Sequence, residues 1–172
     1  MSRLLLALGL ALILALAGEP GLAKLKRATK SSTVAQSGEA TGADGARINA
    51  PGAPFTFANV GKLRRLTKVT ITLTVQDGET GPGDEDVDDL TLVLNGIDTG
   101  IALNGFPTGQ IPTRTISGSP QRAAEILASL KANDGAVNAT IRDADDPGDN
   151  SVGIPAAEDT TLVLEGKQRK KR

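Results

Sequence analysis

The stretch KVTITLTV, residues 68–75, alternates polar and apolar side chains without a break. Because successive side chains of a β-strand point to opposite faces, this alternation predicts a strand with one buried face and one face in water. The strand leads directly into a segment crowded with carboxylates, residues 77–89. The same order returns later, where an alternating stretch at 137–142 runs into the acidic residues 143–149. Such strands are typical of a sandwich, and such loops either bind calcium or lie solvated at its edge.

Further segments repeat the strand pattern. Leucine recurs at every second position of residues 90–94, and Asn95-Gly96 directly after them is a strong signal for a tight hairpin turn. We therefore expect a strand at 90–94 with its hairpin partner at 97–103. A short first strand is expected at 55–57, and the last strand is expected at 160–165.

One helix interrupts the strands, at residues 119–131. Ser119 is a candidate N-cap, Pro120 fits the first turn, and an apolar stripe predicts packing against a sheet; the stripe consists of Ala123, Ile126, Leu127 and Leu130. Six or seven short strands with one short helix predict an all-β fold, a two-layer β-sandwich spanning residues 55–166.

The composition excludes several kinds of chemistry, because the chain contains no His, Cys, Trp or Tyr. Ser-His-Asp and Cys-His hydrolysis, Cys/His zinc sites and thiol redox chemistry all need residues that are missing. With only three Phe, the chain also lacks the aromatic faces on which sugars and single-stranded nucleic acids stack. A hydrolase that uses a pair of carboxylates remains an alternative.

The amino terminus has the features of an export signal. Arg3 forms a short basic region, and residues 4–17 form an apolar stretch of 14 residues, shorter than the roughly 20 needed to span a bilayer. We expect a signal peptide at 1–17 cleaved before Gly18, with a second candidate site before Lys24, and a secreted, extracellular protein. An uncleaved membrane anchor is the alternative. Residues 18–54 are interpreted as a flexible linker, and residues 167–172 as a basic tail.

The net charge of −1 hides a strong asymmetry along the chain. Residues 69–166 hold 17 acidic residues against four basic ones, a net charge of −13, which repels nucleic acid and anionic membranes. The remaining basic residues gather at 24–30, at 62–68 and in the tail, which predicts positive ends on a negative body. The tail is either simply solvated, or the tail or the linker contacts an anionic cell-wall polymer or folds back on the acidic body. The expected partner is thus an extracellular protein or a cell-wall polymer, with no nucleic acid and no stable membrane insertion.

The acidic segments are candidates for a calcium site, because calcium takes six to eight oxygen ligands from carboxylates and backbone carbonyls. The spacing of Asp84, Asp86 and Asp88 begins like an EF-hand, but Asp89 stands where glycine is required and Asn95 where the bidentate glutamate belongs. An EF-hand is therefore rejected, while a site at the edge of the sandwich and plain solvated turns both remain open. The candidate ligands are Asp84, Asp86, Asp88, Asp89, Asp143, Asp145, Asp146 and Asp149.

The order of these motifs resembles the P domain, also called the P/Homo B domain, of subtilisin-like proprotein convertases. The alternating strand at 69–75, the Asp-Asp-Leu strand with its Asn-Gly turn at 88–96, and the Leu-rich strand at 160–165 are similar to segments of that family. So are the stretch from Asn133-Asp-Gly135 to Arg142 and the acidic loop at 143–150. The resemblance implies a jelly-roll-like, noncatalytic sandwich, with calcium bound in some members.

Two classes of function follow. The first is a secreted noncatalytic module that acts in binding or adhesion, or as an accessory to another extracellular protein, stabilised by calcium if the acidic loops bind it. The second is a carboxylate-based extracellular hydrolase, which predicts a concave pocket that holds two carboxylates. An accessory or inhibitor of a partner protease is a further alternative.

Overall fold

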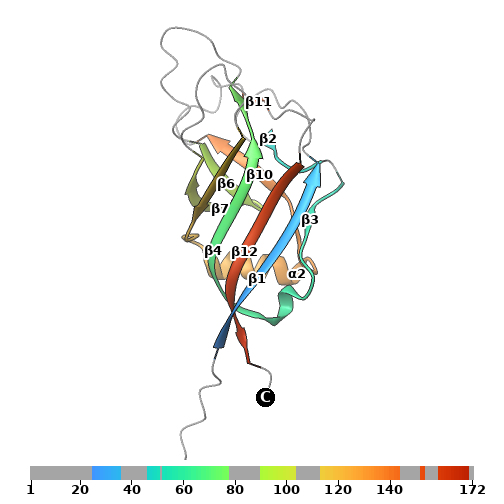
Figure 1. Ribbon diagram of the computed structural model, residues 1–172, viewed down its shortest axis with the longest axis vertical. Helices are drawn as coiled ribbons and strands as arrows, with labels where there is room; N and C mark the ends of the chain where they lie inside the picture. The colour runs from blue at the N-terminus through green and yellow to red at the C-terminus, as the bar shows by residue number, and fades with distance from the viewer. Residues whose placement is uncertain are drawn as a thin grey trace, which may run out of the picture.

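The computed structural model describes most of the segments in which strands are expected. The described residues are 25–35, 46–50, 52–77, 90–103, 113–143, 152–153 and 159–170. They form two four-stranded antiparallel sheets, two short two-stranded ladders and one α-helix, so the expected all-β sandwich with one short helix is confirmed. Figure 1 shows the two sheets as layers, with the helix lying across one end.

The first sheet holds the strand that opened the sequence argument. Its strand order is β1 (Leu25–Ala35), β12 (Asp159–Arg169), β4 (Leu63–Thr74) and β8 (Thr113–Gly118). Strands β12 and β4 are interior strands, while β1 and β8 are the edges. Val69, Ile71 and Leu73 of β4 are buried on the inner face, as the alternation predicts. The threonines of the other face are less exposed than expected, since Thr70 and Thr72 are half-buried and Thr74 is buried.

The second sheet has the order β2 (Ala46–Arg47), β10 (Ala139–Asp143), β6 (Leu90–Leu94) and β7 (Ile97–Ala102). The expected hairpin is present between β6 and β7. Its two turn residues have φ angles of 51° at Asn95 and 74° at Gly96, both in the left-handed region that a two-residue type I′ turn requires. The short ladders pair β3 (Phe55–Thr56) with β9 (Ala136–Val137), and β5 (Gln76–Asp77) with β11 (Val152–Gly153).

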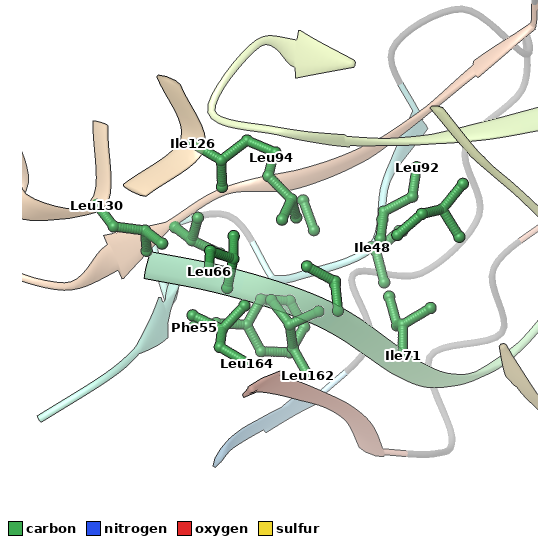
Figure 2. Packing of buried hydrophobic residues seen from close by; sticks show 14 of the residues in the cluster. Ile48, Phe55, Leu66, Ile71, Leu92, Leu94, Ile126, Leu130, Leu162 and Leu164 are labelled. Atoms are coloured by element: carbon green, nitrogen blue, oxygen red, sulfur yellow. The ribbon is translucent and has the colours of Figure 1, made fainter. Parts of the chain in front are cut away.

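The core lies between the two sheets and under the helix α2 (Ala123–Ala132), which follows β8. Figure 2 shows Leu162 and Leu164 of β12 beside Phe55, with Leu66 of β4 directed toward the helix residue Leu130. Helix α2 also contacts the 3₁₀ turn η2 (Val60–Lys62) that precedes β4. The core closes with aliphatic side chains and two phenylalanines, because the chain has no larger aromatic residue to place there.

The helix begins later than its capping signal suggests. Arg122 is the N-cap residue and makes no side-chain cap, while the hydroxyl of Ser119 donates to the carbonyl of Thr67 at 3.1 Å. Ser119 therefore ties the approach to the helix onto β4, and its expected role as a cap is wrong. After the helix, Gly135 adopts a φ of 92° and its carbonyl accepts a hydrogen bond from the amide of Phe57 at 3.0 Å.

A group of asparagine side chains joins β9 and β10 to the rest of the second sheet. Buried Asn49 accepts a hydrogen bond from the amide of Ala139 at 2.8 Å and donates to the side-chain oxygen of Asn138 at 3.1 Å. The side-chain oxygen of Asn95 accepts a hydrogen bond from the amide of Asn138 at 2.9 Å. These bonds satisfy backbone groups at the point where the ladder is interrupted.

Three expectations about segment boundaries are wrong. Residues 25–35, placed in the expected linker at 18–54, form strand β1, which pairs with β12 over 11 register positions. The expected basic tail at 167–172 starts too early, because β12 continues to Arg169. Strand β8 was not expected at all. β1 and β8 escape the apolar pattern because each is an edge strand, and edge strands carry many polar and charged residues.

Candidate functional site

Strand β4 contains two irregularities in its pairing with β12, and they decide which of its side chains face water. The register runs from Lys68↔Glu165 to Leu66↔Gly166, and from Arg65↔Lys167 to Leu63↔Gln168. One residue of β4 is therefore extra at each shift, Thr67 at the first and Arg64 at the second, which is the pattern of a β-bulge. The burial period in this part of the strand becomes three: Leu63, Leu66 and Val69 are buried while Arg64, Arg65 and Lys68 are exposed.

The first bulge is held by specific contacts. The hydroxyl of Thr67 donates to the carbonyl of Glu165 at 3.0 Å, and the carbonyl of Thr67 accepts the hydroxyl of Ser119. Gly166 lies so close to β4 that a Cβ atom there would be 2.2 Å from the carbonyl oxygen of Arg65. The absence of a side chain at Gly166 thus lets β12 approach the bulged part of β4. This close contact places the backbone of Arg65 directly against Gly166.

The bulges bring three cationic side chains into one row across three strands. Arg27 of β1 is the register partner of Lys167 of β12, and Lys167 is the register partner of Arg65 of β4. Register partners in antiparallel strands lie on the same face about 5 Å apart, so the three charges are direct neighbours. All three side chains are exposed. We call Arg27, Lys167 and Arg65 the cationic row.

The neighbouring register position is different in charge. There Lys68 faces Glu165, and the Nζ of Lys68 lies 3.5 Å from a carboxylate oxygen of Glu165. The cationic row itself has no carboxylate among its register partners. The cationic row is therefore an arrangement of like charges only. The ion pair of Lys68 and Glu165 on the same face contains both signs of charge.

Two hollows border the row. The first, of about 360 Å³, includes two members of the row, and its lining is Arg27, Ala28, Thr29, Thr67, Lys68, Glu165, Gly166 and Lys167. The second, of about 760 Å³, is a groove between β4 and helix α2; its lining is Arg64, Arg65, Leu66, Thr67, Ser119, Pro120, Gln121, Ala123, Ala124, Leu127, Ala128 and Lys131. Thr67 lines both hollows, so they adjoin at the first bulge. Glu165 is the single carboxylate among these lining residues, and it is paired with Lys68.

Arg122 lies close to the groove in sequence but is engaged elsewhere. Its guanidinium donates a hydrogen bond to the carboxylate of Glu125, which lowers the pKa of Glu125 and raises the pKa of Arg122. Both effects come first from that hydrogen bond, since each group stabilises the charged form of the other. The pair is fully exposed and neutralises the first turn of α2, so Arg122 is not counted in the site.

The three basic segments of the sequence meet at one end of the molecule. The start of β1, the start of β4 and the end of β12 lie at the end that α2 crosses in Figure 1. The basic segments, which were expected to form separate positive ends, therefore lie together at one end of the protein. We call this surface the basic end; its described cations are Lys26, Arg27, Lys62, Arg64, Arg65, Lys68, Lys131, Lys167, Arg169 and Lys170.

The predicted calcium ligands fall almost entirely outside the described residues. Asp143 is described only as the last backbone position of β10, where it pairs with Leu90, the residue that follows the first acidic segment. Asp77, which opens that segment, pairs with Val152, just beyond the second. The boundaries of both acidic segments are therefore register neighbours at the end of the sandwich opposite the basic end (Figure 1). The other seven candidates lie outside the described residues: Asp84, Asp86, Asp88, Asp89, Asp145, Asp146 and Asp149.

Further features of the described residues concern metal binding, catalytic carboxylates and the membrane. Within the described segments no group of three acidic residues is placed to hold a metal ion. Neither hollow contains the pair of carboxylates that a hydrolase of the proposed kind needs. In the part of the chain that the structure describes, no helix is long and apolar enough to cross a bilayer.

Comparisons with known proteins add no relative. No family model, no curated protein and no solved structure matches this chain. The resemblance to the P domain stays a prediction from the sequence motifs.

Proposed function

We propose that the protein is a noncatalytic binding module of the extracellular space that captures an anionic partner with its basic end. The cationic row of Arg27, Lys167 and Arg65 carries this proposal. Like charges placed directly opposite each other destabilise an antiparallel sheet. Bound anionic groups would supply the missing counter-charge, so the row is favourable only with a partner in place.

Protection of a sheet edge does not account for the row. Natural proteins place lysine on exposed edge strands to prevent pairing with another chain, and Lys26 and Lys30 of β1 can serve that purpose. However, Lys167 of β12 has register partners on both sides, Arg27 and Arg65, so the central charge of the row guards no edge. Arg65 precedes the part of β4 that pairs with β8, which begins at Val69, and this part of β4 lies beside the groove along helix α2. Solubility does not require the row either, because soluble surfaces usually mix charges of both signs.

The noncatalytic assignment is supported by what lines the two hollows. Arginine, lysine, threonine and alanine dominate the lining, and the only acid there is ion-paired. Such a surface attracts and positions anionic groups, but it offers no unpaired general acid or base for the chemistry of a hydrolase. The export signal expected at residues 1–17 supports an extracellular setting. Calcium, if bound by the acidic segments at the opposite end, would stabilise the sandwich without contributing to this surface.

Binding to a polyanion tests the proposal. With long-chain polyphosphate as the probe, glutamine at all three positions of the row should weaken binding by on the order of a hundredfold, at about 1 kcal/mol for each basic residue near an anionic surface. The matched control removes three positive charges outside the basic end: Arg47→Gln, Arg114→Gln and Arg142→Gln. Binding that is lost equally in both triple variants would show that only the net charge matters, and would remove the basis of the proposal.

A further inference from the structure

We infer that the binding surface continues from the cationic row into the groove beside α2, and that its partner is a linear phosphate-bearing polymer. The inference rests on the proposed function, since it assumes that the basic end binds anions. It adds a second subsite, formed by Arg64 and Lys131, and it specifies the chemical class of the partner.

The two hollows are neighbours, and the inferred track runs from one into the other. Thr67 lines both of them, and Arg65 belongs to the row and also lines the groove. The bulge at Arg64 allows two consecutive arginines to be exposed, so the track can turn from the face of the sheet toward the helix without losing its charge. The order of cations along it is Arg27, Lys167, Arg65, Arg64 and Lys131.

The dimensions suit an extended chain. The row crosses two interstrand spacings, a length of about 10 Å. Ala124 and Lys131 both line the groove, and the seven helical steps from one to the other span about 10 Å along the helix axis. A compact anion would fill only part of a track on the order of 20 Å long, whereas a flexible polymer can engage both parts together, with the gain in affinity that linked contacts provide.

The groove combines a smooth apolar floor with charged walls. Ala124 and Ala128 are exposed and, being four residues apart on α2, lie on the same side of the helix as Leu127 and Lys131. Their small side chains leave room for a thin chain to lie against the helix. Among the residues that the structure describes, no carboxylate lines the groove with Arg64, Arg65 and Lys131.

The side-chain chemistry favours phosphate in a polymer. Three of the five cations are arginines, whose planar guanidinium matches phosphate oxygens in a two-point contact. The chain has no Trp or Tyr, two of the three residue types enriched at the hot spots of protein interfaces, so only its arginines could anchor an acidic protein surface. Stacking of sugars or single-stranded bases also needs exposed aromatic rings. The track therefore suits a polymer that carries negative charges at repeated positions along its length.

The test compares chain length. The full chain is titrated with tripolyphosphate and with long-chain polyphosphate, and wild type should bind the long chain at least tenfold more tightly per binding site. Arg64→Gln combined with Lys131→Gln should abolish this length gain and leave tripolyphosphate binding within twofold of wild type. Ala128→Leu, which fills the groove floor without changing charge, should reduce the length gain as well. Arg47→Gln combined with Arg114→Gln is the matched control and should retain the gain; thermal melts confirm that each variant is folded.

The outcomes separate this inference from the proposed function. Loss of binding in the row variant together with no length gain in wild type would overturn the extended track and leave the proposed function standing. A row variant that binds both probes like wild type would overturn both. Polyglutamate or duplex DNA bound as tightly as long-chain polyphosphate at equal ionic strength would overturn the phosphate polymer as the partner.

Discussion

Replacing Lys167 by glutamine should stabilise the free protein, because the sheet holds this lysine between two other cations. Directly opposed side chains have Cβ atoms about 5 Å apart, and long basic side chains can splay until their charges are about 6 Å apart. At about 6 Å in water two unit charges repel by about 0.7 kcal/mol. With a Debye length of about 8 Å at physiological ionic strength, about half of this repulsion remains. Glutamine keeps part of the aliphatic stem and removes only the charge.

The central position carries twice the repulsion of a flanking position. Lys167→Gln removes two like-charged pairs and should raise the free energy of unfolding by about 0.7 kcal/mol at physiological salt. Arg27→Gln and Arg65→Gln each remove one pair, so each should gain about 0.3 kcal/mol. For Lys167→Gln the gain should grow to about 1.1 kcal/mol at about 0.01 M salt and fall below about 0.2 kcal/mol at about 1 M, because the Debye length shortens.

Unfolding in urea, an uncharged denaturant, measures these differences at each salt concentration. Lys68→Gln is the matched control, since Lys68 lies on the same face of the sheet but opposite Glu165, with which it forms an ion pair. This control should leave stability unchanged or lower it by at most about 1 kcal/mol. A variant at Lys167 that is no more stable than wild type at low salt, or whose gain persists at high salt, would refute the repulsion argument.

Three further predictions concern other parts of the molecule. Gly135→Ala should destabilise the fold by about 2 kcal/mol or more, because the new Cβ would lie 2.3 Å from the carbonyl oxygen of Phe57 at a φ of 92°; a urea midpoint indistinguishable from wild type would contradict this. Asn49→Ala should cost about 1–3 kcal/mol by leaving a buried strand amide without its acceptor, and an unchanged unfolding curve would show that water replaces the side chain. If the acidic segments bind calcium, millimolar calcium should raise the melting temperature above that in EDTA, magnesium should not reproduce the rise, and Asp86→Asn or Asp145→Asn should reduce it.

The strands that could be predicted are those that bury one full face. Residues 69–75 alternate between threonine and apolar side chains, and residues 90–94 carry leucine at every second position, although Val93 between them is also buried. The left-handed turn at Asn95-Gly96 requires the residues found there, so periodicity and turn chemistry identify these strands. Strand β1 contributes only Ala28 and Val34 to the core as partly buried residues, which leaves too little apolar signal for prediction. Its position depends on pairing with β12, a contact between opposite ends of the chain that local patterns do not encode.

The basic end was missed for a different reason. In the sequence, most cations of the basic end are spread over three separate segments, whereas most carboxylates of the chain are concentrated in two. The sequence therefore points to the acidic segments as the functional site. A signal was nevertheless present at Leu63, Leu66 and Val69, whose spacing of three fits a strand with two bulges and exposes the residues between them. Recognising it requires knowing that Gly166 lies opposite, which is a tertiary fact.

The pairing of the first strand with the last also sets how the molecule responds to a pulling force. Leu25 and Arg169 are register partners, so the chain enters and leaves the sheet at the same point. A force that pulls Leu25 and Arg169 apart would break the pairing of β1 with β12 one register position at a time. It would not shear all 11 register positions together. The first pairs to part are those beside Arg27 and Lys167. A partner that binds Arg27 and Lys167 together would therefore hold β1 and β12 together at the point where mechanical unfolding begins.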